Sequence, residues 1–496
     1  MALSAMDSTI VATAIPSIVG DLGGFALFAW VFSIYVLVQA VTIPIYGKLA
    51  DLYGRKPILI AGTLVFLGGS ALSGLAWNMV ALIVFRGVQG IGAGAIVPMV
   101  TTVAGDLYDV RERARIQGWL SSVWGISAVV GPAIGGFLAE YASWRWIFYI
   151  NIPIGGLAIY MIAGALHEHV TRRAHRIDYG GSILLAAGAT LLIFGLLEAG
   201  VSWSWISAPS ALVFAGAVAA LIGFVVAERR AAEPTLPLWV FTRRLLVGAN
   251  AATLGLGIIS IGLTTFLPTF AQGVLKVDAV AAGFILAAMS ISWPLSSAMS
   301  GRFYLRIGFR DTALIGTGIA VLSGVIFLGV GSSSPPWLAA VGSLVMGAGL
   351  GLLSTPLIVG VQAAVGWGRR GVVTGSNMFA RQLGQAIGAA ICGSIFNVAL
   401  AGWLASAPAG LKGKLPTSVN AASQVVGGGA TKLPAAVVAY IRQGVYVAGH
   451  DVFWALVVTA VGCVIVLLLV PRRFAPLEFV EDEPDPAALP LEETHV

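Results

Sequence analysis

Long apolar stretches alternate along this chain with short clusters of basic residues. A transmembrane helix needs about 20 predominantly apolar residues. The stretches that can form one are 1–19, 27–47, 58–77, 79–104, 116–139, 146–166, 177–198, 208–227, 246–271, 279–301, 311–331, 337–360, 374–399 and 449–471. The loops at 167–176 and 228–244 are both basic, so an even number of spans lies between them, and 177–227 has room for two. The pattern predicts an all-α polytopic membrane protein with fourteen transmembrane helices.

The basic residues are distributed unevenly between the two sets of loops. Seven clusters hold 20 of the 28 lysines and arginines, and the alternating loops hold six. Because cytoplasmic loops carry an excess of Lys and Arg, the clusters predict the cytoplasmic side and place both termini there. The first span is short at its front, so either the numbering begins inside a trimmed span or the true start lies upstream.

Composition supports a membrane protein and excludes several other classes. The chain is 58% hydrophobic and 10% charged, whereas soluble domains carry roughly 25% charged residues. The net charge of +6 is spread over loops rather than gathered in a patch, which argues against nucleic-acid binding. Cys392 and Cys463 lie in apolar runs and form no CxxC pair, so neither a disulfide framework nor a metal site is predicted. No phosphate-binding GK[ST] loop occurs, so ATP is not the expected energy source.

The chain contains an internal repeat. GKLADLYG at 47–54 matches GRFYLRIG at 301–308, and GIGAG at 90–94 matches GAGLG at 347–351. Gly131 and Gly135 match Gly384 and Gly388, so the three offsets are 254, 257 and 253. Parallel six-span repeats are a recurring plan of transporters, with substrate bound between the halves. The predicted divisions are a bundle at 1–166, a linker with two inserted spans at 167–245, a bundle at 246–473 with a long external loop at 400–448, and an acidic cytoplasmic tail at 474–496.

Five segments resemble the major facilitator superfamily, specifically its fourteen-span drug:proton antiporter branch. They are DSTIVATAIP at 7–16, GKLADLYGRKP at 47–57, RGVQGIGAG from Arg86 to Gly94, GISAVVGPAIGG at 125–136 and WRWIFYINIPIG at 144–155. The resemblance implies the major facilitator fold, with two six-helix bundles and two extra spans. It also implies a proton-driven multidrug efflux antiporter in a bacterial inner membrane that is not an enzyme and needs no cofactor.

The resemblance leaves rival functions open. Export of a native lipid, siderophore or other metabolite, with drugs as incidental cargo, is the nearest alternative. Uptake by symport and a non-transporting membrane sensor or assembly partner are further alternatives. The expected partners are the lipid bilayer, small lipophilic substrates and protons, with no nucleic acid, and the expected state is a monomer.

Two charged residues within the spans are candidates for proton coupling. An arginine at the centre of a transmembrane helix raises the free energy of membrane insertion by about 2.5–3.5 kcal/mol, even on the scale that gives the lowest cost. Arg86 must therefore face protein, water or a carboxylate. Asp7 is the acidic residue in the front part of a span, where a desolvated carboxyl can load and release a proton. The resemblance ties Arg86 to proton transfer and places a functional acid at Asp7. The alternatives are a purely structural arginine and an acid near the cytoplasmic interface.

The loop at 47–57 is a candidate gating latch. Gly47 and Gly54 permit a tight turn, and a carboxylate such as Asp51 is favoured at a helix N-terminus. The resemblance implies that this loop joins the two halves on the cytoplasmic side. Asp51 is expected to meet the start of the span at 374–399 together with Arg381, and Arg55 is expected to pair with Asp106. A loop that merely sets topology is the alternative.

Further candidates come from a glycine motif and from helical spacing. The resemblance identifies Gly125, Gly131, Pro132, Gly135 and Gly136 as an antiporter motif of exporters, although close helix packing alone would favour the same glycines. Polar and aromatic positions predict a substrate cavity lined by Trp30, Tyr35, Gln39, Asn250, Ser260, Thr264, Phe266, Trp293, Asn377 and Gln385. No carboxylate lies in the interior of the spans between 246 and 399, which disfavours doubly charged cations and favours neutral or monocationic lipophiles.

Overall fold

The computed structural model is built of helices and describes residues 1–23, 27–166, 178–199, 203–231, 234, 236–408, 411, 415 and 434–472. The acidic tail predicted at 474–496 and the central part of the loop predicted at 400–448 lie outside the described residues. The helices of the first part of the chain are α1 Ala2–Leu22, α2 Phe28–Tyr53, α3 Arg55–Gly74, α4 Met79–Leu107, α5 Val110–Tyr141, α6 Trp146–Tyr149, α7 Asn151–Ala165, α8 Tyr179–Glu198 and α9 Ala208–Glu228. Those of the second part are η2 Leu238–Phe241, α10 Arg244–Val274, α11 Ala279–Ile307, α12 Phe309–Leu328, α13 Pro336–Ala363, η3 Trp367–Arg369, α14 Arg370–Ala405 and α16 Ala435–Leu469.

Twelve helices within the described residues are long and apolar enough to cross a membrane. They coincide with twelve of the predicted spans. The remaining two predicted ranges, 1–19 and 116–139, lie on α1 and α5, and both helices contain side chains outside the described part of the chain. The protein is therefore an all-helical, multi-pass membrane protein.

Short polar residues and glycines mark the helix boundaries. Asn78, Asp109 and Asp278 each accept hydrogen bonds from backbone N–H groups in the first turn of the following helix, which satisfies donors that have no partner within the helix. Gly54 ends α2 with φ 92°, and Gly308 ends α11 with φ 94°. Residues with a side chain rarely adopt this backbone conformation, so the two tight turns need glycine. The two glycines are the last residues of the matched repeat segments 47–54 and 301–308.

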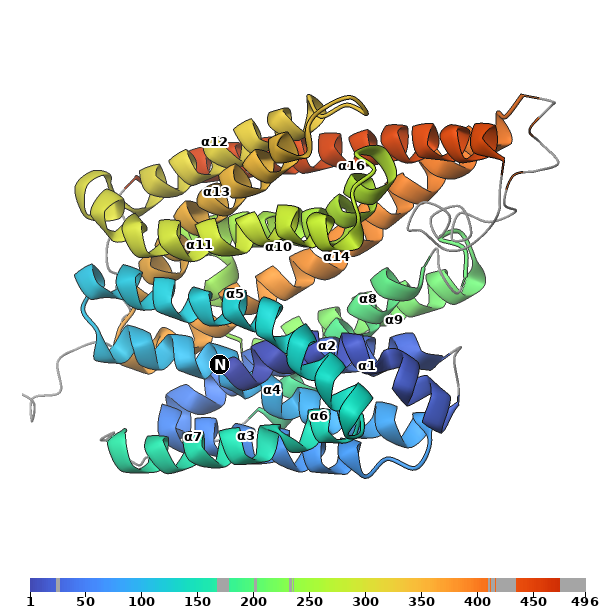
Figure 1. Cartoon of the computed structure of the whole chain (residues 1–496). Helices are drawn as coiled ribbons and strands as arrows, with labels where there is room; N and C mark the ends of the chain where they lie inside the picture. The colour runs from blue at the N-terminus through green and yellow to red at the C-terminus, as the bar shows by residue number, and fades with distance from the viewer. Residues whose placement is uncertain are drawn as a thin grey trace, which may run out of the picture.

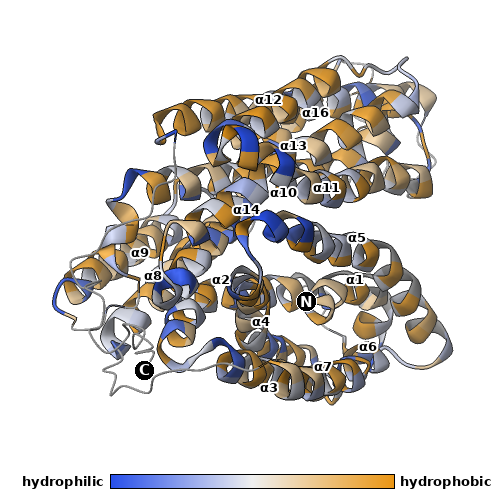
Figure 2. Ribbon diagram, turned by 90° about the vertical axis from the view of Figure 1, so that its left-hand side faces the viewer, coloured by the Kyte–Doolittle hydropathy of each residue, from blue (hydrophilic) through white to orange (hydrophobic). Residues whose placement is uncertain are grey.

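The helices form two layers that lie one above the other in Figure 1, α1–α7 below and α10–α16 above. Helices α8 and α9 lie at one side of the seam between the layers, and Figure 2 shows that the helices are apolar along most of their length. Within one apolar cluster, Ala189 and Ile193 of α8 pack with Leu37 of α2 and with Ala386 of α14. The α8–α9 hairpin therefore touches both layers.

The same close packing occurs in both layers at the spacing of the internal repeat. A Cβ at Gly90 of α4 would lie 2.7 Å from the carbonyl oxygen of Tyr35 in α2. A Cβ at Gly347 of α13 would lie 2.4 Å from the carbonyl oxygen of Met289 in α11. Both contacts are too short for any side chain. Glycine therefore lets α4 lie against α2 and α13 against α11, as small residues do in membrane helix pairs.

One predicted element differs from the structure. The sequence predicts a long external loop at 400–448, followed by a span at 449–471. The structure instead has one continuous helix, α16, from Ala435 to Leu469. No proline interrupts this range, and Val445 and Ala448 are buried together with the rest of the helix face. Packing along this continuous face stabilises a longer helix than the membrane thickness requires.

Two ends of the molecule are used below to locate residues. The basic end is where α2, α4 and α11 finish and where α3, α5 and α14 begin; Lys48, Arg111, Arg302 and Arg370 lie there. The opposite end is where α1 finishes and α4 begins. The basic end lies at the left of Figure 1.

Candidate functional site

A buried triad joins Asp7, Arg86 and Gln89. One Nη of Arg86 donates to Asp7 Oδ2 at 2.6 Å and to Gln89 Oε1 at 2.7 Å, and the Gln89 amide donates to Asp7 Oδ1 at 2.8 Å. The side chains of Asp7 and Arg86 are both 0% exposed. Each carboxylate oxygen therefore has a donor, as a charge removed from water requires.

Neighbouring groups fix the guanidinium of Arg86. Its Nε donates to the carbonyl oxygen of Val31 at 3.2 Å, and its Cζ lies 4.1 Å from the centre of the Tyr35 ring. The Tyr35 hydroxyl lies 3.3 Å from the Ser4 hydroxyl, to which the Gln39 amide donates at 3.5 Å. The triad is thus bordered by a polar shell built from α1 and α2. Among the predicted cavity residues, Tyr35 and Gln39 belong to this shell.

The triad lies deep within the helical layers. Asp21, near the end of α1, pairs with Arg145 at 2.7 Å at the opposite end of the molecule. Asp7 precedes Asp21 by fourteen residues, which corresponds to about 21 Å along a helix. Tyr35 precedes Asp51 of the basic end by sixteen residues, or about 24 Å. Since the hydrocarbon core of a bilayer is about 30 Å thick, the triad lies near its middle.

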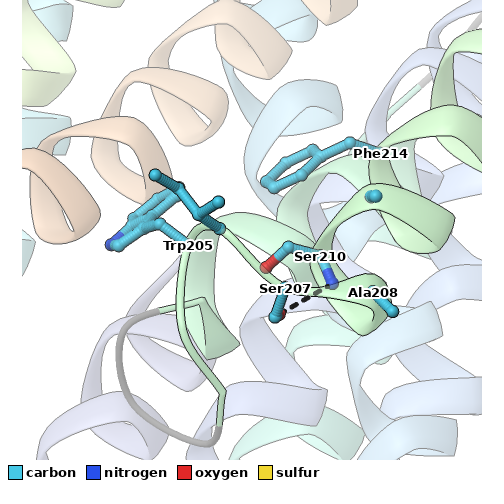
Figure 3. Close-up of a pocket in the computed structure, with 7 residues that line it drawn as sticks. Trp205, Ser207, Ala208, Ser210 and Phe214 are labelled. Carbon is cyan, nitrogen blue, oxygen red and sulfur yellow. Dashed lines mark hydrogen bonds between the residues drawn. The ribbon is translucent and has the colours of Figure 1, made fainter.

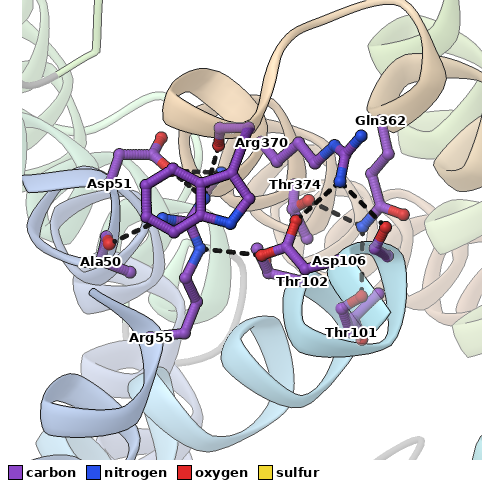
Figure 4. Close-up of polar contacts among 12 residues, drawn as sticks. Ala50, Asp51, Arg55, Thr101, Thr102, Asp106, Gln362, Arg370 and Thr374 are labelled. Atoms are coloured by element: carbon purple, nitrogen blue, oxygen red, sulfur yellow. Dashed lines mark hydrogen bonds and ion pairs between the residues drawn. The ribbon is translucent and has the colours of Figure 1, made fainter. Parts of the chain in front are cut away.

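A second polar group, the basic-end cluster, links the two layers (Figure 4). It consists of Asp51, Arg55, Asp106, Trp367 and Arg370. Asp106 forms an ion pair with Arg55 of its own layer at 3.0 Å and accepts a hydrogen bond from Arg370 of the other layer at 2.8 Å. Arg55 also donates to the Trp367 carbonyl oxygen at 2.5 Å, and its Cζ lies 3.6 Å from the centre of the Trp367 ring. Arg55 is 1% exposed, so these contacts are shielded from solvent.

Asp51 binds the first turn of α14. Its carboxylate oxygens accept from the backbone N–H groups of Gly371 and Val372, both at 2.8 Å, and from Arg55 at 2.9 Å. The first N–H groups of a helix have no partner within the helix and carry a partial positive charge, so they suit a carboxylate. A Cβ at Gly47 would lie 2.6 Å from the Gly371 carbonyl oxygen, so glycine lets α2 approach α14 this closely.

The structure brings together most of the predicted latch but corrects one member. Asp51 meets the start of α14, and Arg55 pairs with Asp106, while Gly47 and Gly54 lie at the packing contact and at the turn. The prediction that Arg381 joins this contact is wrong. Arg381 lies ten residues beyond Gly371, about 15 Å further along α14, with its Cζ 5.4 Å from the centre of the Trp293 ring.

The glycine motif of α5 lies partly on the contact with α11. A Cβ at Gly125 would lie 2.9 Å from the Ser290 carbonyl oxygen, whereas a Cβ at Gly136 would have nothing within 4 Å. Gly131 and Gly135 are buried. The side chain of Pro132 lies outside the described residues. The small size of Gly125 therefore lets α5 of the first layer approach α11 of the second.

The remaining predicted cavity residues lie in three places. Asn377 of α14 donates to Asn250 and Thr253 of α10 at 3.2 Å and 2.9 Å, and Gln385 follows on the same helix. Ser260 and Thr264 donate to carbonyl oxygens of their own helix. The aromatic residues are dispersed: Trp30 lies against Phe194 of α8, Phe266 against Phe396, and Trp293 beside Arg381. The predicted cavity residues therefore do not form a single cluster.

Several residues in or near the two polar groups are absent from the sequence prediction. Gln89 is three residues after Arg86 on α4, so helical spacing could have identified it. Arg370 lies in a basic cluster that predicts only which side is cytoplasmic, yet it supplies the inter-layer ion pair. Gln362, which donates across the layers to the Thr101 carbonyl oxygen at 3.2 Å, has no local sequence signal.

A separate groove of about 430 Å³ lies on the α8–α9 hairpin at the opposite end (Figure 3). Trp205, Ser207, Ser210 and Phe214 are among the residues that line it. The Trp205 indole donates to Ser394 of α14 at 3.1 Å, so the groove adjoins the second layer. None of the residues of the two polar groups lines it.

Comparison with known sequences gives a family match and close relatives. The model of the Major Facilitator Superfamily matches residues 1–389. The multidrug transporter protein MdtP of Bacillus subtilis (strain 168) is 33% identical, over 96% of this chain and 92% of its own length. Multidrug resistance protein 3 of the same organism is 37% identical, over 83% of this chain and 80% of its own length.

Comparison with solved structures shows the same fold. The proton:xylose symporter XylE matches with a TM-score of 0.60 at 12% identity, over 96% of this chain and 95% of its own. The human organic anion transporter MFSD10 matches with a TM-score of 0.59 at 14% identity, over 94% and 97%. At these identities the likeness concerns the fold and not the cargo.

Proposed function

The chain belongs to the Major Facilitator Superfamily, and within it we propose that the protein is a proton-coupled multidrug efflux antiporter of the fourteen-span branch. The similarity to two bacterial multidrug proteins over most of their length supports efflux of drugs. The proposed spans are the twelve described candidates together with α1 and α5. The proposed location is a bacterial inner membrane, with the basic end and both termini in the cytoplasm.

The buried triad is the observation that carries the proposal of proton coupling. Asp7 is an acid near the middle of the membrane, and its charge is balanced by Arg86. Protonation of Asp7 would remove the negative partner and weaken both hydrogen bonds that it accepts as an anion. The carboxylate and the guanidinium could then separate, and the helices α1 and α4 that carry them could move relative to each other. A proton entering from one side and leaving to the other would thus be coupled to a change of shape.

The basic-end cluster is the proposed gate. Contacts from Asp51, Arg55 and Asp106 join α2, α3 and α4 to η3 and the start of α14. These contacts hold the two layers together at the proposed cytoplasmic end. Alternating access then requires that they break when the site opens to the cytoplasm. The divisions at 1–166 and 246–473 are the proposed moving bundles, with 167–245 as the inserted linker.

The proposed cargo is lipophilic and either neutral or monocationic, and the proposed working unit is a monomer that needs no cofactor. Inward movement of one proton through a potential of 100 mV supplies about 2.3 kcal/mol. A free energy of 1.4 kcal/mol corresponds to a tenfold concentration ratio, so one proton can concentrate a neutral cargo several-tenfold.

Reconstituted proteoliposomes with an imposed proton gradient test this function. The probes are Nile red, a neutral fluorescent lipophile, and ethidium, a monocation. Gradient-driven movement of either probe is expected in the native protein and is expected to be lost in Asp7→Asn. The matched control is Asp21→Asn, which removes the other ion-paired aspartate of α1 at the exposed end and should leave transport intact. Probe movement that is unaffected by collapsing the gradient would overturn the proposal.

A further inference from the structure

Arg381 is a guanidinium near the middle of the membrane that has no counter-charge. Among the described residues, it makes no ion pair and no hydrogen bond, and its Nε is buried without a partner. Its neighbour is the ring of Trp293, 5.4 Å from Cζ. Lying about 15 Å along α14 from the basic end, it is far from the loops in which arginine is normally solvated.

The second layer contains no acid that could neutralise Arg381. Between residues 244 and 472 the acidic residues are Asp278, Asp311 and Asp451. Asp278 caps the start of α11 at the opposite end, and Asp311 pairs with two arginines at the basic end. Asp451 is exposed on α16. Asp7, the acid of the first layer that lies near the middle of the membrane, is bound by its own arginine and glutamine.

An aromatic ring and two amide side chains lie beside Arg381, and hydrogen bonds fix the ring and one of the amides. The Trp293 indole donates to the Ser354 hydroxyl of α13 at 3.3 Å, which fixes the ring beside the guanidinium. One turn before Arg381, Asn377 is held by its hydrogen bonds to α10, and one turn after it lies Gln385. The α14 face therefore presents a cation between two amides, beside a flat aromatic ring. Guanidinium groups bind carboxylates through paired N–H donors, and a ring can stack on an aromatic cargo.

We propose that Arg381, Trp293 and Ser354 form a subsite for the acidic group of lipophilic cargo, a carboxylate being the simplest example. This subsite adds lipophilic acids to the cargo of the proposed exporter and ranks them above permanent monocations, which Arg381 repels. The claim that such acids are exported rests on the proposed function. The binding itself does not depend on it.

Binding to the full-length protein in lipid nanodiscs, without any gradient, tests the subsite. Three probes share one hydrophobic ring and differ in charge: 1-pyrenebutyrate, its neutral amide and the corresponding trimethylammonium. The expected order of affinity after subtraction of empty nanodiscs is carboxylate, then amide, then ammonium. Arg381→Gln is expected to weaken carboxylate binding about tenfold, as loss of one charge-assisted contact does, and to leave amide binding little changed.

Two further variants separate binding from folding and from general charge effects. Arg302→Gln removes an exposed arginine at the basic end of α11 and should leave all three affinities unchanged. Arg381→Lys retains the charge but not the paired donors, so it should keep the order of probes with weaker carboxylate binding. If Arg381→Gln does not fold, the subsite is tested by the order of the three probe affinities in the native protein and in Arg381→Lys.

Two results would overturn the subsite: an ammonium probe that binds the native protein as tightly as the carboxylate, or an equal loss for all three probes in Arg381→Gln. Gradient-driven transport of Nile red by the same variants in proteoliposomes is independent of the acid group. Failure of the subsite is thereby distinguished from failure of the proposed efflux function.

Discussion

Two arginines lie in the membrane interior, and their surroundings differ. Arg86 has a carboxylate, an amide and a backbone carbonyl as partners, all within 3.2 Å. Arg381 has an aromatic ring and no acid among the described residues. Since burial of an unpaired charge is costly, the first arginine is expected to contribute to stability and the second to binding.

The stability of the fold should depend on the buried pair. Arg86→Met leaves Asp7 buried without its positive partner, which typically costs about 3–5 kcal/mol. We expect a large drop in the apparent melting temperature in detergent. The double variant Asp7→Asn with Arg86→Met should recover much of that loss, because neither charge then remains unpaired.

The matched control for this pair is Arg145→Gln. Arg145 and Asp21 lie 2.7 Å apart, close to the 2.6 Å of the buried pair, but both side chains are substantially exposed, so the change should be small. If Arg86→Met were no less stable than Arg145→Gln, the buried pair would not stabilise the fold more than the exposed pair does.

The sequence could reveal single buried charges but not their partners. Asp7 and Arg86 stand out because each interrupts an apolar run. Their pairing joins residues 79 positions apart, and no periodicity encodes such a contact. For Arg381, the sequence predicts the correct helix but the wrong position along it. Helical spacing does not show how far Arg381 lies from the basic end.

At the level of helices, contact between α5 and α11 depends on glycine. Gly125→Ala would place a methyl group 2.9 Å from the Ser290 carbonyl oxygen, so the two layers would have to separate locally. We expect reduced transport and reduced thermal stability. Gly136→Ala, within the same motif, has open space and should be tolerated. Equal effects of the two substitutions would contradict the packing explanation.

The basic-end cluster should control the opening of its end. Asp51→Ala removes the acceptor of two backbone N–H groups of α14, so α2 should separate from α14 more often. Spin labels at Glu112 of α5 and Arg306 of α11, both exposed, would report this in electron paramagnetic resonance as a longer mean distance or a broader distance distribution.

Asp311→Ala provides the comparison for that experiment. Asp311 also lies at the basic end, but it pairs with Arg310 and Arg472 of its own layer. Its loss should leave the distances unchanged. Unaltered distances in Asp51→Ala would show that Asp51 does not hold the layers together.

Helices were predicted well where hydropathy alone decides their extent. Twelve predicted spans coincide with helices of the required length and apolarity. The sequence failed at α16, because an extension beyond the membrane is stabilised by packing that a hydropathy window does not measure. The turn glycines Gly54 and Gly308 could be matched from the repeat, since both need a backbone conformation that other residues rarely adopt.

At the scale of the whole molecule, the proposed proton coupling and the proposed gating belong to two separate polar groups. The triad lies near the middle of the membrane within one layer, and the basic-end cluster joins the two layers about 24 Å away. Coupling therefore requires that a change of charge at Asp7 alters the relative position of α2, α4 and α14. The α8–α9 hairpin contacts α2 and α14 and must accommodate the same movement.

The most direct test of proton antiport is to let the cargo drive the proton. Proteoliposomes are given a gradient of Nile red, no initial pH difference and a pH-sensitive dye inside. Antiport predicts that cargo leaving the vesicles draws protons in and acidifies the lumen, and that Asp7→Asn abolishes this signal while Asp21→Asn retains it. Cargo movement without any pH change, or with protons moving in the same direction as the cargo, would contradict the account.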